Sequence, residues 1–530
     1  MLGISNKISR TGSPPLILAI ALVVAVLMAL PVAYLFIRTA SSGSVVWDIV
    51  LQAETAVILG RTMLLALAVA AAALAIALPL AWVTVRTDIP GRRVLSVLTA
   101  LPLVVPSYIN ALALVSAIGP RGVLQQWLEG PFGIDRLPDI HGFPGAWLAL
   151  TLSTYPYLLL SIRAALWGMD PALEEASRSL GRSPRQTFFH VTLPNLRPAI
   201  AAGGLLIALY AMSDFGAVAL MSFDSFTRVI FLQIESAFDL RGATALSLVL
   251  GMFTISLVIA EQQARGWASY HAVGLGAQRP PMTVKLGRWR WPAVGLCILV
   301  VLIALGLPIS VLLYWFLQGV SNNVDVSFPA QNILNGVYVS AVAALVAIAA
   351  AVPIAVMAVR FPDRLARLVE GMTWTGFALP GVVVALSLVY FGINFARPFY
   401  QTMAMLVFAY CVLFLPIATG AVRTSLLQLS PHIEESARSL GRAPVKVSAS
   451  VTLPLVWPGI MVGAALVFMT SMKELPATLL LAPAGFRTLA TQLWAATDAA
   501  SYTRAAVPAL LLVLVSAVPV GILLYKERRG

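Results

Sequence analysis

Long runs of apolar residues alternate with short polar segments along nearly the whole chain. A helix needs about 20 apolar residues to cross roughly 30 Å of hydrocarbon, and the runs have about this length. The pattern therefore predicts an all-α membrane protein with about 12 transmembrane helices. The predicted spans are 15–37, 63–85, 94–117, 144–166, 199–221, 243–263, 292–316, 336–359, 372–394, 399–421, 458–482 and 503–525. We expect the first run to be a retained anchor, because it is longer than the apolar core of a signal peptide.

Composition and charge support this interpretation and exclude others. Of the 530 residues, 59% are hydrophobic and 11% are charged, whereas a soluble globular chain carries about 25% charge. This excludes a soluble enzyme and a disordered protein. If the N-terminus is cytoplasmic, most of the Lys and Arg residues in the connecting segments fall on the cytoplasmic side, as the positive-inside rule requires. We therefore expect both termini in the cytoplasm, and we attribute the net charge of +13 to topology rather than to a nucleic-acid partner.

The two halves of the chain repeat one another. The segment EEASRSLGRSP at 174–184 recurs as EESARSLGRAP at 434–444, and VTLP at 191–194 recurs at 451–454. Further matching pairs are Arg163 and Arg423, Pro198 and Pro458, Asp214 and Glu474, Phe226 and Phe486, Gln233 and Gln492, Asp239 and Asp498, Pro79 and Pro353, and Arg86 and Arg360. An even number of spans in each half makes the repeats parallel. We expect repeats at 1–263 and 292–530, joined by a cytoplasmic linker at 264–291.

The most similar segments of the two halves are polar loops, at about 170–198 and 430–458, which the topology places in the cytoplasm. Asp170 and Ser430 each precede a proline and are predicted to cap a short helix. Gly181 and Gly441 can take the left-handed conformation that ends such a helix. An amphipathic connector lying on lipid headgroups is one interpretation. A repeated docking surface for two copies of one cytoplasmic partner is the interpretation we favour, because lipid contact does not require the same polar detail twice.

These residues resemble a known family. Glu175-Ala176, then Gly181, then Val191-Thr192-Leu193-Pro194 follow the spacing of the EAA loop of ABC-importer permeases, and the second loop follows it again, with serine replacing one alanine of the motif in each copy. The chain is most similar to the fused two-domain permeases of ferric-iron uptake, whose likeness extends to MSDFGAVALMSFDSFT at 212–227 and MKELPATLLLAP at 472–483.

The resemblance implies the type I ABC importer permease fold and a transport subunit of the bacterial inner membrane. It implies two copies of a cytoplasmic ATPase and a periplasmic or lipid-anchored binding protein as partners, besides membrane lipids. It assigns ATPase coupling to Glu174, Glu175, Ala176, Gly181, Leu193, Pro194, Glu434, Glu435, Ala437, Gly441, Leu453 and Pro454. The chain itself is expected to be no enzyme and to bind no cofactor. None of its five lysines follows a glycine as a phosphate-binding loop requires, so ATP and Mg²⁺ belong to the partner.

Two repeat-equivalent carboxylates, Asp214 and Glu474, are predicted within or at the edge of spans, where a charge is costly. They are candidate pathway residues that would approach a shared axis and offer oxygen ligands to a hard cation. A structural role, as partners of Lys473 or of helix ends, is the alternative. We expect no stable metal site, since Lys473 would repel a cation and the four histidines lie scattered in loops.

The resemblance favours ferric iron as the cargo and leaves thiamine, polyamines and phosphonates open. A secondary transporter driven by an ion gradient is the rival class, which hydropathy does not distinguish from an ABC permease. The doubled cytoplasmic loop favours the ATP-driven importer.

Overall fold

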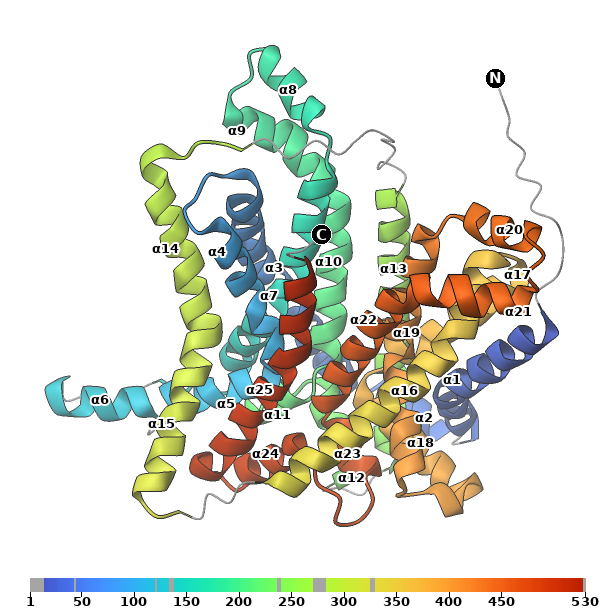
Figure 1. Ribbon diagram of the computed structural model, residues 1–530. Coiled ribbons are helices and arrows are strands. Elements are labelled where there is room, and N and C mark those ends of the chain that lie inside the picture. Colours follow the sequence, from blue (N-terminus) through green and yellow to red (C-terminus); the bar gives the residue numbers. More distant parts are fainter. Residues whose placement is uncertain are drawn as a thin grey trace. The chain divides into compact units, whose positions relative to one another are not determined.

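The computed structural model describes residues 14–41, 44–119, 122–132, 138–235, 240–269, 283–324 and 329–527. In this part the chain is helical apart from loops and an isolated bridge between Thr87 and Val284 (Figure 1), which confirms the all-α prediction. The helices up to residue 269 are α1 (Pro15–Ser41), α2 (Ser44–Val50), α3 (Ala53–Arg86), α4 (Arg92–Ala100), α5 (Ser107–Ile118), α6 (Val123–Phe132), α7 (Phe143–Gly168), α8 (Pro171–Ser179), α9 (Pro184–Thr187), α10 (Leu193–Ser213), α11 (Gly216–Leu220), α12 (Phe226–Glu235) and α13 (Leu240–Ser269).

The remaining helices are α14 (Arg290–Val301), α15 (Leu307–Ser321), α16 (Ala330–Arg360), α17 (Arg364–Ala378), α18 (Gly381–Phe395), α19 (Met403–Gln428), α20 (Pro431–Ser439), α21 (Pro444–Val447), α22 (Leu453–Met472), α23 (Pro476–Leu481), α24 (Leu489–Asp498) and α25 (Tyr502–Glu527). Short π-helical turns, η2 (Phe188–Thr192) and η6 (Ser448–Thr452), lead into α10 and α22. The same local geometry therefore precedes the same span in both halves.

Nine helices of the described residues are long and apolar enough to cross a membrane. A tenth would be the pair Arg92–Val104 and Ser107–Gln125, which is bent by 91°. Two shorter apolar helices, Gly381–Phe395 and Tyr502–Ala517, lie where the other two spans are predicted. The bent pair breaks at Pro106, which donates no backbone hydrogen bond. Prolines also lie inside the counterpart helices of the two halves, at Pro79, Pro156 and Pro198 and at Pro353, Pro416 and Pro458.

The chain forms two compact units, and each combines helices from both halves of the sequence. Unit 1 contains most of α1 together with α16, α17, most of α18, and α19 to α23. There Tyr34 of α1 packs its ring against Tyr390, Phe391 and Phe395, with ring centroids 6.0–6.4 Å apart. Unit 2 contains α2 to α15 together with α24 and α25. The predicted boundaries at 263 and 292 describe the sequence repeats, and these units are a different division of the chain.

Small residues let the long helices of unit 2 approach closely. α3 buries Ala66, Ala73, Ala77 and Ala81. On α10, a Cβ atom added to Gly203 would lie 2.5 Å from Leu158 of α7, so only glycine fits there without a shift. Helices packed in lipid rely on such close contact, because the hydrophobic effect does not drive helices to associate there.

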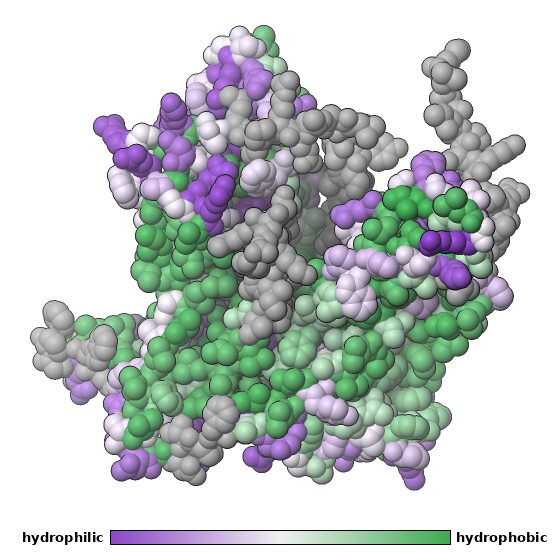
Figure 2. Space-filling view, viewed as in Figure 1, coloured by the Kyte–Doolittle hydropathy of each residue, from purple (hydrophilic) through white to green (hydrophobic). Residues whose placement is uncertain are grey.

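Hydrophobic residues cover the sides of the helices, and hydrophilic residues gather at their ends. In Figure 2 a hydrophobic surface covers α14 and α15 of unit 2, and hydrophilic residues cover α8 and α9 of the same unit. This is the distribution expected of a protein whose helix sides face lipid and whose loops face water. The loop carrying α8 and α9 therefore extends beyond the apolar part of unit 2.

Candidate functional site

The first repeated loop, residues 170–198, folds as two short helices followed by a π-helical turn. Asp170 caps α8 by accepting the N–H of Ala172 at 2.9 Å. Gly181 ends the turn after α8 with φ +83°, in the left-handed region that favours glycine. The second repeated loop, residues 430–458, repeats this path with Gly441 at φ +79°. Ser430 occupies the capping position before α20, but its side chain makes no capping hydrogen bond, in contrast to the prediction.

Glu174 anchors the first repeated loop inside unit 2. Its side chain is 7% exposed and lies 3.4 Å (Oε2 to Nη1) from the guanidinium of Arg86, the last residue of α3. The Thr192 hydroxyl donates a 2.8 Å hydrogen bond to Oε1 of the same carboxylate. Arg86 Nη2 also donates to the Leu166 carbonyl at 3.3 Å. One carboxylate thus joins α8 to α3 and to the turn that leads into α10.

Glu434 makes the same connections inside unit 1. Oε1 of Glu434 lies 3.0 Å from Nη2 of Arg360, the last residue of α16, and accepts the Thr452 hydroxyl at 3.0 Å. Arg360 also donates to the Leu429 carbonyl at 3.4 Å. We call these two arrangements the loop anchors, Arg86–Glu174–Thr192 and Arg360–Glu434–Thr452. The same Arg–Glu–Thr arrangement therefore anchors both repeated loops.

The residues assigned to coupling separate into three groups. Glu174 and Glu434 are buried. Leu193-Pro194 and Leu453-Pro454 begin α10 and α22, where proline suits the first turn of a helix. The members that lie on the loop surface, exposed or half-buried, are Glu175, Ala176, Gly181, Glu435, Ala437 and Gly441.

Two exposed leucines were not singled out from the sequence. Leu180 and Leu440 follow the short helices α8 and α20 at repeat-equivalent positions, and each is 82% exposed. Single exposed leucines are common on protein surfaces, but the same exposed leucine at the same position of two polar loops suits a docking surface that is used twice. The string LGR recurs in both loops, and this repetition is the sequence pattern that could have identified the two leucines. The comparison of the two halves pairs Arg86 with Arg360 but assigns neither residue a role.

The candidate pathway carboxylates stand at helix breaks rather than inside spans. α10 ends at Ser213, and Asp214 accepts the N–H of Ala217 at 2.9 Å, which caps α11. Ser107 donates a hydrogen bond to the other carboxylate oxygen of Asp214. α22 ends at Met472, and Glu474 accepts the N–H of Ala477 at 3.2 Å, which caps α23. The structure thus gives each carboxylate a structural role at the end of a span, and their approach to a shared axis stays a prediction.

A cavity of about 320 Å³ lies in unit 2, directly after the end of α10. We call it the distal cavity, because α10 separates it from the first repeated loop by roughly 30 Å. Three aromatic rings form part of its wall: Phe215 lies 4.5 Å from Phe231 and 5.1 Å from Trp494 between ring centroids. The wall therefore includes residues from both halves of the chain.

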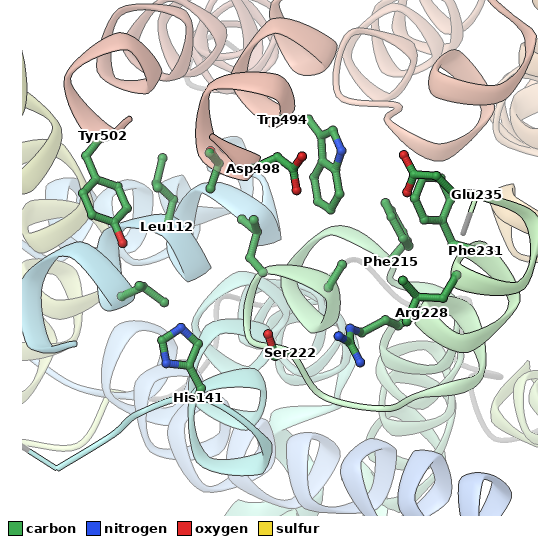
Figure 3. Close-up of a pocket in the computed structure, with 15 residues that line it drawn as sticks. Leu112, His141, Phe215, Ser222, Arg228, Phe231, Glu235, Trp494, Asp498 and Tyr502 are labelled. Atoms are coloured by element: carbon green, nitrogen blue, oxygen red, sulfur yellow. The ribbon is translucent and has the colours of Figure 1, made fainter. Parts of the chain in front are cut away.

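The polar groups of the distal cavity come from four segments (Figure 3). They include His141, Arg228, Glu235, Asp498 and Tyr502. Partial burial and, second, the neighbouring Asp498 carboxylate raise the pKa of Glu235. Among the described residues no three His, Cys, Asp or Glu side chains come together in a group able to hold a metal ion. The cavity therefore offers a pair of carboxylates rather than a closed metal cage.

Comparison with known proteins explains the duplication. Residues 73–261 and 343–529 both match the family described as "Binding-protein-dependent transport system inner membrane component". The chain belongs to this family. The family domain is present twice, so this member is a fused two-domain permease, as the sequence predicts. Members of the family are multi-pass inner-membrane transport components rather than enzymes, and the family implies an ATPase and a substrate-binding protein as partners.

Several relatives show which permeases are similar. The chain is 34% identical over 503 residues to the Fe(3+)-transport system permease protein FbpB 2 of Haemophilus influenzae, covering 94% of this chain and 95% of the relative. It is 25% identical over 411 residues to the ferric transport system permease protein of Actinobacillus pleuropneumoniae, covering 74% and 59%. It is 31% identical over 189 residues to a probable sulfate transport system permease of Nephroselmis olivacea, covering 34% and 64%. The resemblance to ferric-iron permeases is therefore confirmed.

Proposed function

We propose that this permease is the membrane subunit of an ATP-driven importer of ferric iron, with both termini and both repeated loops in the cytoplasm. Each loop docks one copy of a separate ATPase subunit, and a periplasmic binding protein delivers the cargo to the opposite side. The observation that carries the proposal is the repetition of one buried loop anchor beneath an equally exposed leucine, Leu180 in one loop and Leu440 in the other. Two identical subunits would need two such surfaces.

The loop anchors explain how an ATPase could move the spans. Glu174 connects α8 to Arg86 at the end of α3 and to Thr192 at the entrance of α10. A displacement of α8 would therefore reach two spans together rather than deform a flexible loop. Glu434 offers the same route to α16 and α22. Closure of an ATPase dimer would move both pairs of spans at once, α3 with α10 and α16 with α22. Alternation between inward-open and outward-open states would follow.

The cargo is inferred from the relatives and from charge. The relatives that match most of this chain are described as ferric permeases, whereas the sulfate permease matches about a third of it. The distal cavity carries the carboxylates Glu235 and Asp498, which would repel an oxyanion such as sulfate. Hard oxygen donors suit a hard cation such as Fe³⁺. Thiamine, polyamines or phosphonates as cargo remain alternatives that the test below separates.

The proposal is tested by reconstitution of the full chain in lipid vesicles with its ATPase and its iron-loaded binding protein. We expect radioactive iron to accumulate only when ATP is present on the ATPase side, and dissipating the proton and sodium gradients should leave the uptake unchanged. Uptake that continues without ATP and collapses with an ion gradient would identify a secondary transporter instead. Thiamine, a polyamine and a phosphonate, each with its own binding protein, serve as cargo controls.

A further inference from the structure

Arg163 binds the helix that leads into the first repeated loop to two neighbouring helices. It lies on α7, about one and a half turns before that helix ends at Gly168. The side chain is buried, and each of its three nitrogens donates a hydrogen bond. Nε donates to the Thr84 hydroxyl of α3 at 3.0 Å, Nη1 to the Ser96 carbonyl of α4 at 2.7 Å, and Nη2 to the Thr99 hydroxyl of α4 at 2.7 Å. The planar guanidinium thus fixes the orientation of α4 against α7 as well as its distance.

Tyr155 adds a second connection between the same two helices. Its buried phenol donates to the Thr99 carbonyl at 2.8 Å, so Thr99 accepts hydrogen bonds from α7 at both its backbone and its side chain. Buried polar groups that are satisfied in this way specify one arrangement of the helices that carry them. We call the hydrogen bonds of Arg163 to α4 the first arginine contact.

Arg423 makes the counterpart connection in unit 1. It matches Arg163 in the repeat and also lies about one and a half turns before the end of its helix, α19. Its Nε lies 3.3 Å from Oε1 of Glu370 on α17. α17 is the counterpart of α4, because both helices end at the alanine of the string Ala-Leu-Pro, at 100–102 and at 378–380. We call this ion pair the second arginine contact; a carboxylate takes the place of the neutral acceptors of the first.

Each of the helices held in this way runs directly into a break in the chain. α4 is followed by the turn η1 (Leu101–Val104) and by Pro106, where the two helices are bent by 91°. α17 is followed by Pro380, after which α18 begins at Gly381. Proline lacks the N–H that would continue a helix, and residues at the ends of helices are where hinges absorb a change of direction. The arginine contacts therefore hold the chain just before each break.

Beyond the first break, α5 leads to the end of α10 and to the distal cavity. Ser107, the first residue of α5, donates to the Asp214 carboxylate that caps α11. Leu112 and Val115 of the same helix line the distal cavity. A displacement of α7 that the first arginine contact passes to α4 would therefore reach this cavity through α5.

We propose that Arg163 and Arg423 are positioning residues of transport, which pass a displacement of the repeated loops to the breaks before α5 and α18. The proposal rests on the proposed function, in which a docked ATPase displaces the loops. The loop anchors act on α3 and α10, and on α16 and α22. The arginine contacts add a route to α4 and α17, which lie outside the loop anchors. Without an arginine contact the loop would move while its broken span stayed behind, and ATP would be hydrolysed without cargo crossing.

The test measures the cargo transported per ATP hydrolysed, in vesicles that contain the full chain, the ATPase and the iron-loaded binding protein. Arg163→Gln should lower this ratio about tenfold or more, because hydrogen bonds from a charged group are among the strongest in a protein. Glu370→Gln should lower it about two- to fivefold, since the side chains of Arg423 and Glu370 are partly exposed and such pairs are weaker. Arg423→Glu should also lower the ratio, and combining it with Glu370→Arg should restore it, because the exchanged pair attracts again.

Arg93→Gln on α4 and Arg367→Gln on α17 are the matched controls, because each removes an exposed arginine from a helix that an arginine contact holds. Both should couple like the unaltered chain. Loss of folded chain lowers uptake and coupled hydrolysis together, so a lower ratio reports coupling rather than stability. If Arg163→Gln gives no folded chain, the variants of the second arginine contact decide.

The inference is overturned if Glu370→Gln and a folded Arg163→Gln chain couple like the two controls. It is also overturned if the exchanged pair couples no better than Arg423→Glu alone. In both cases the unaltered chain still imports iron with ATP, so the proposed function stands. Absence of ATP-driven uptake by the unaltered chain would instead overturn the proposed function, and the inference with it.

Discussion

Arg86 and Glu174 form a buried ion pair that joins the last residue of α3 to the first repeated loop, with side chains only 2% and 7% exposed. Nε and Nη1 of Arg86 form no hydrogen bond, so the Glu174 carboxylate is the group that compensates this guanidinium charge. Removing one partner of a buried pair leaves the other charge uncompensated, which costs more than the pair itself contributes. The anchor should therefore be sensitive to loss of the carboxylate charge.

Glu174→Gln should lower the free energy of unfolding by about 3 kcal/mol, the lower end of the range for breaking a buried pair. Glu434→Gln should cost less, because the side chains of Arg360 and Glu434 are 16% and 11% exposed and water compensates part of the loss. Denaturation of the purified chain, followed by circular dichroism, measures both. Glu175→Gln is the control, since this exposed neighbour should change stability by less than about 0.5 kcal/mol. Equal effects of all three variants would mean that the anchors do not hold the loops.

Leu180→Ser and Leu440→Ser should leave the fold intact and weaken binding of the ATPase subunit. Each leucine is 82% exposed, so its loss removes little internal packing. A docked leucine that becomes fully buried contributes about 1.5–3 kcal/mol, which corresponds to a loss of roughly tenfold or more in affinity for each variant. Co-purification of the ATPase with the tagged chain reports the binding. Leu51→Ser is the matched control, because Leu51 is 81% exposed outside the loops. Unchanged ATPase binding by both loop variants would exclude the two leucines from the docking surface.

The spans, the duplication and the two loops could be predicted because each depends on a local pattern: an apolar run, a recurring string, or a proline and a glycine at the ends of short helices. The loop anchors could not, because Arg86 is far from Glu174 in the chain and only the packing of α3 against the loop brings them together. The hydropathy pattern places the ends of α10 and α22 too far along the chain. Apolar residues continue into α11 and α23, beyond the two carboxylates near which these spans end. α1 belongs to the first half of the sequence, but most of it packs with helices of the second half in unit 1. This packing depends on contacts such as Tyr34 with Tyr390, which no local sequence pattern predicts.

Gly181→Val and Gly441→Val should uncouple ATP hydrolysis from uptake. No atom lies within 4 Å of a Cβ atom added at either position, so space is sufficient, but φ values of +83° and +79° disfavour a β-branched residue. The expected cost is about 1–3 kcal/mol, which favours a different loop conformation. The ratio of iron transported to ATP hydrolysed in vesicles should therefore fall. Asparagine tolerates this conformation, so Gly181→Asn and Gly441→Asn should retain coupling. A valine double variant that transports like the unaltered chain would show that loop geometry does not matter for coupling.

Asp214→Asn and Glu474→Gln separate the two roles considered for these carboxylates. The amide oxygen can still accept the N–H of Ala217 or Ala477, so the caps of α11 and α23 should persist and the folded chain should still bind its ATPase. If the negative charge lies on the cation pathway, iron uptake should fall by about tenfold or more, since each variant removes a favourable charge interaction with the passing ion. Asp214→Ala and Glu474→Ala remove both cap and charge, and they serve as the comparison for lost structure. Uptake that survives in the amide variants and is lost in the alanine variants would assign the two carboxylates to the helix ends alone.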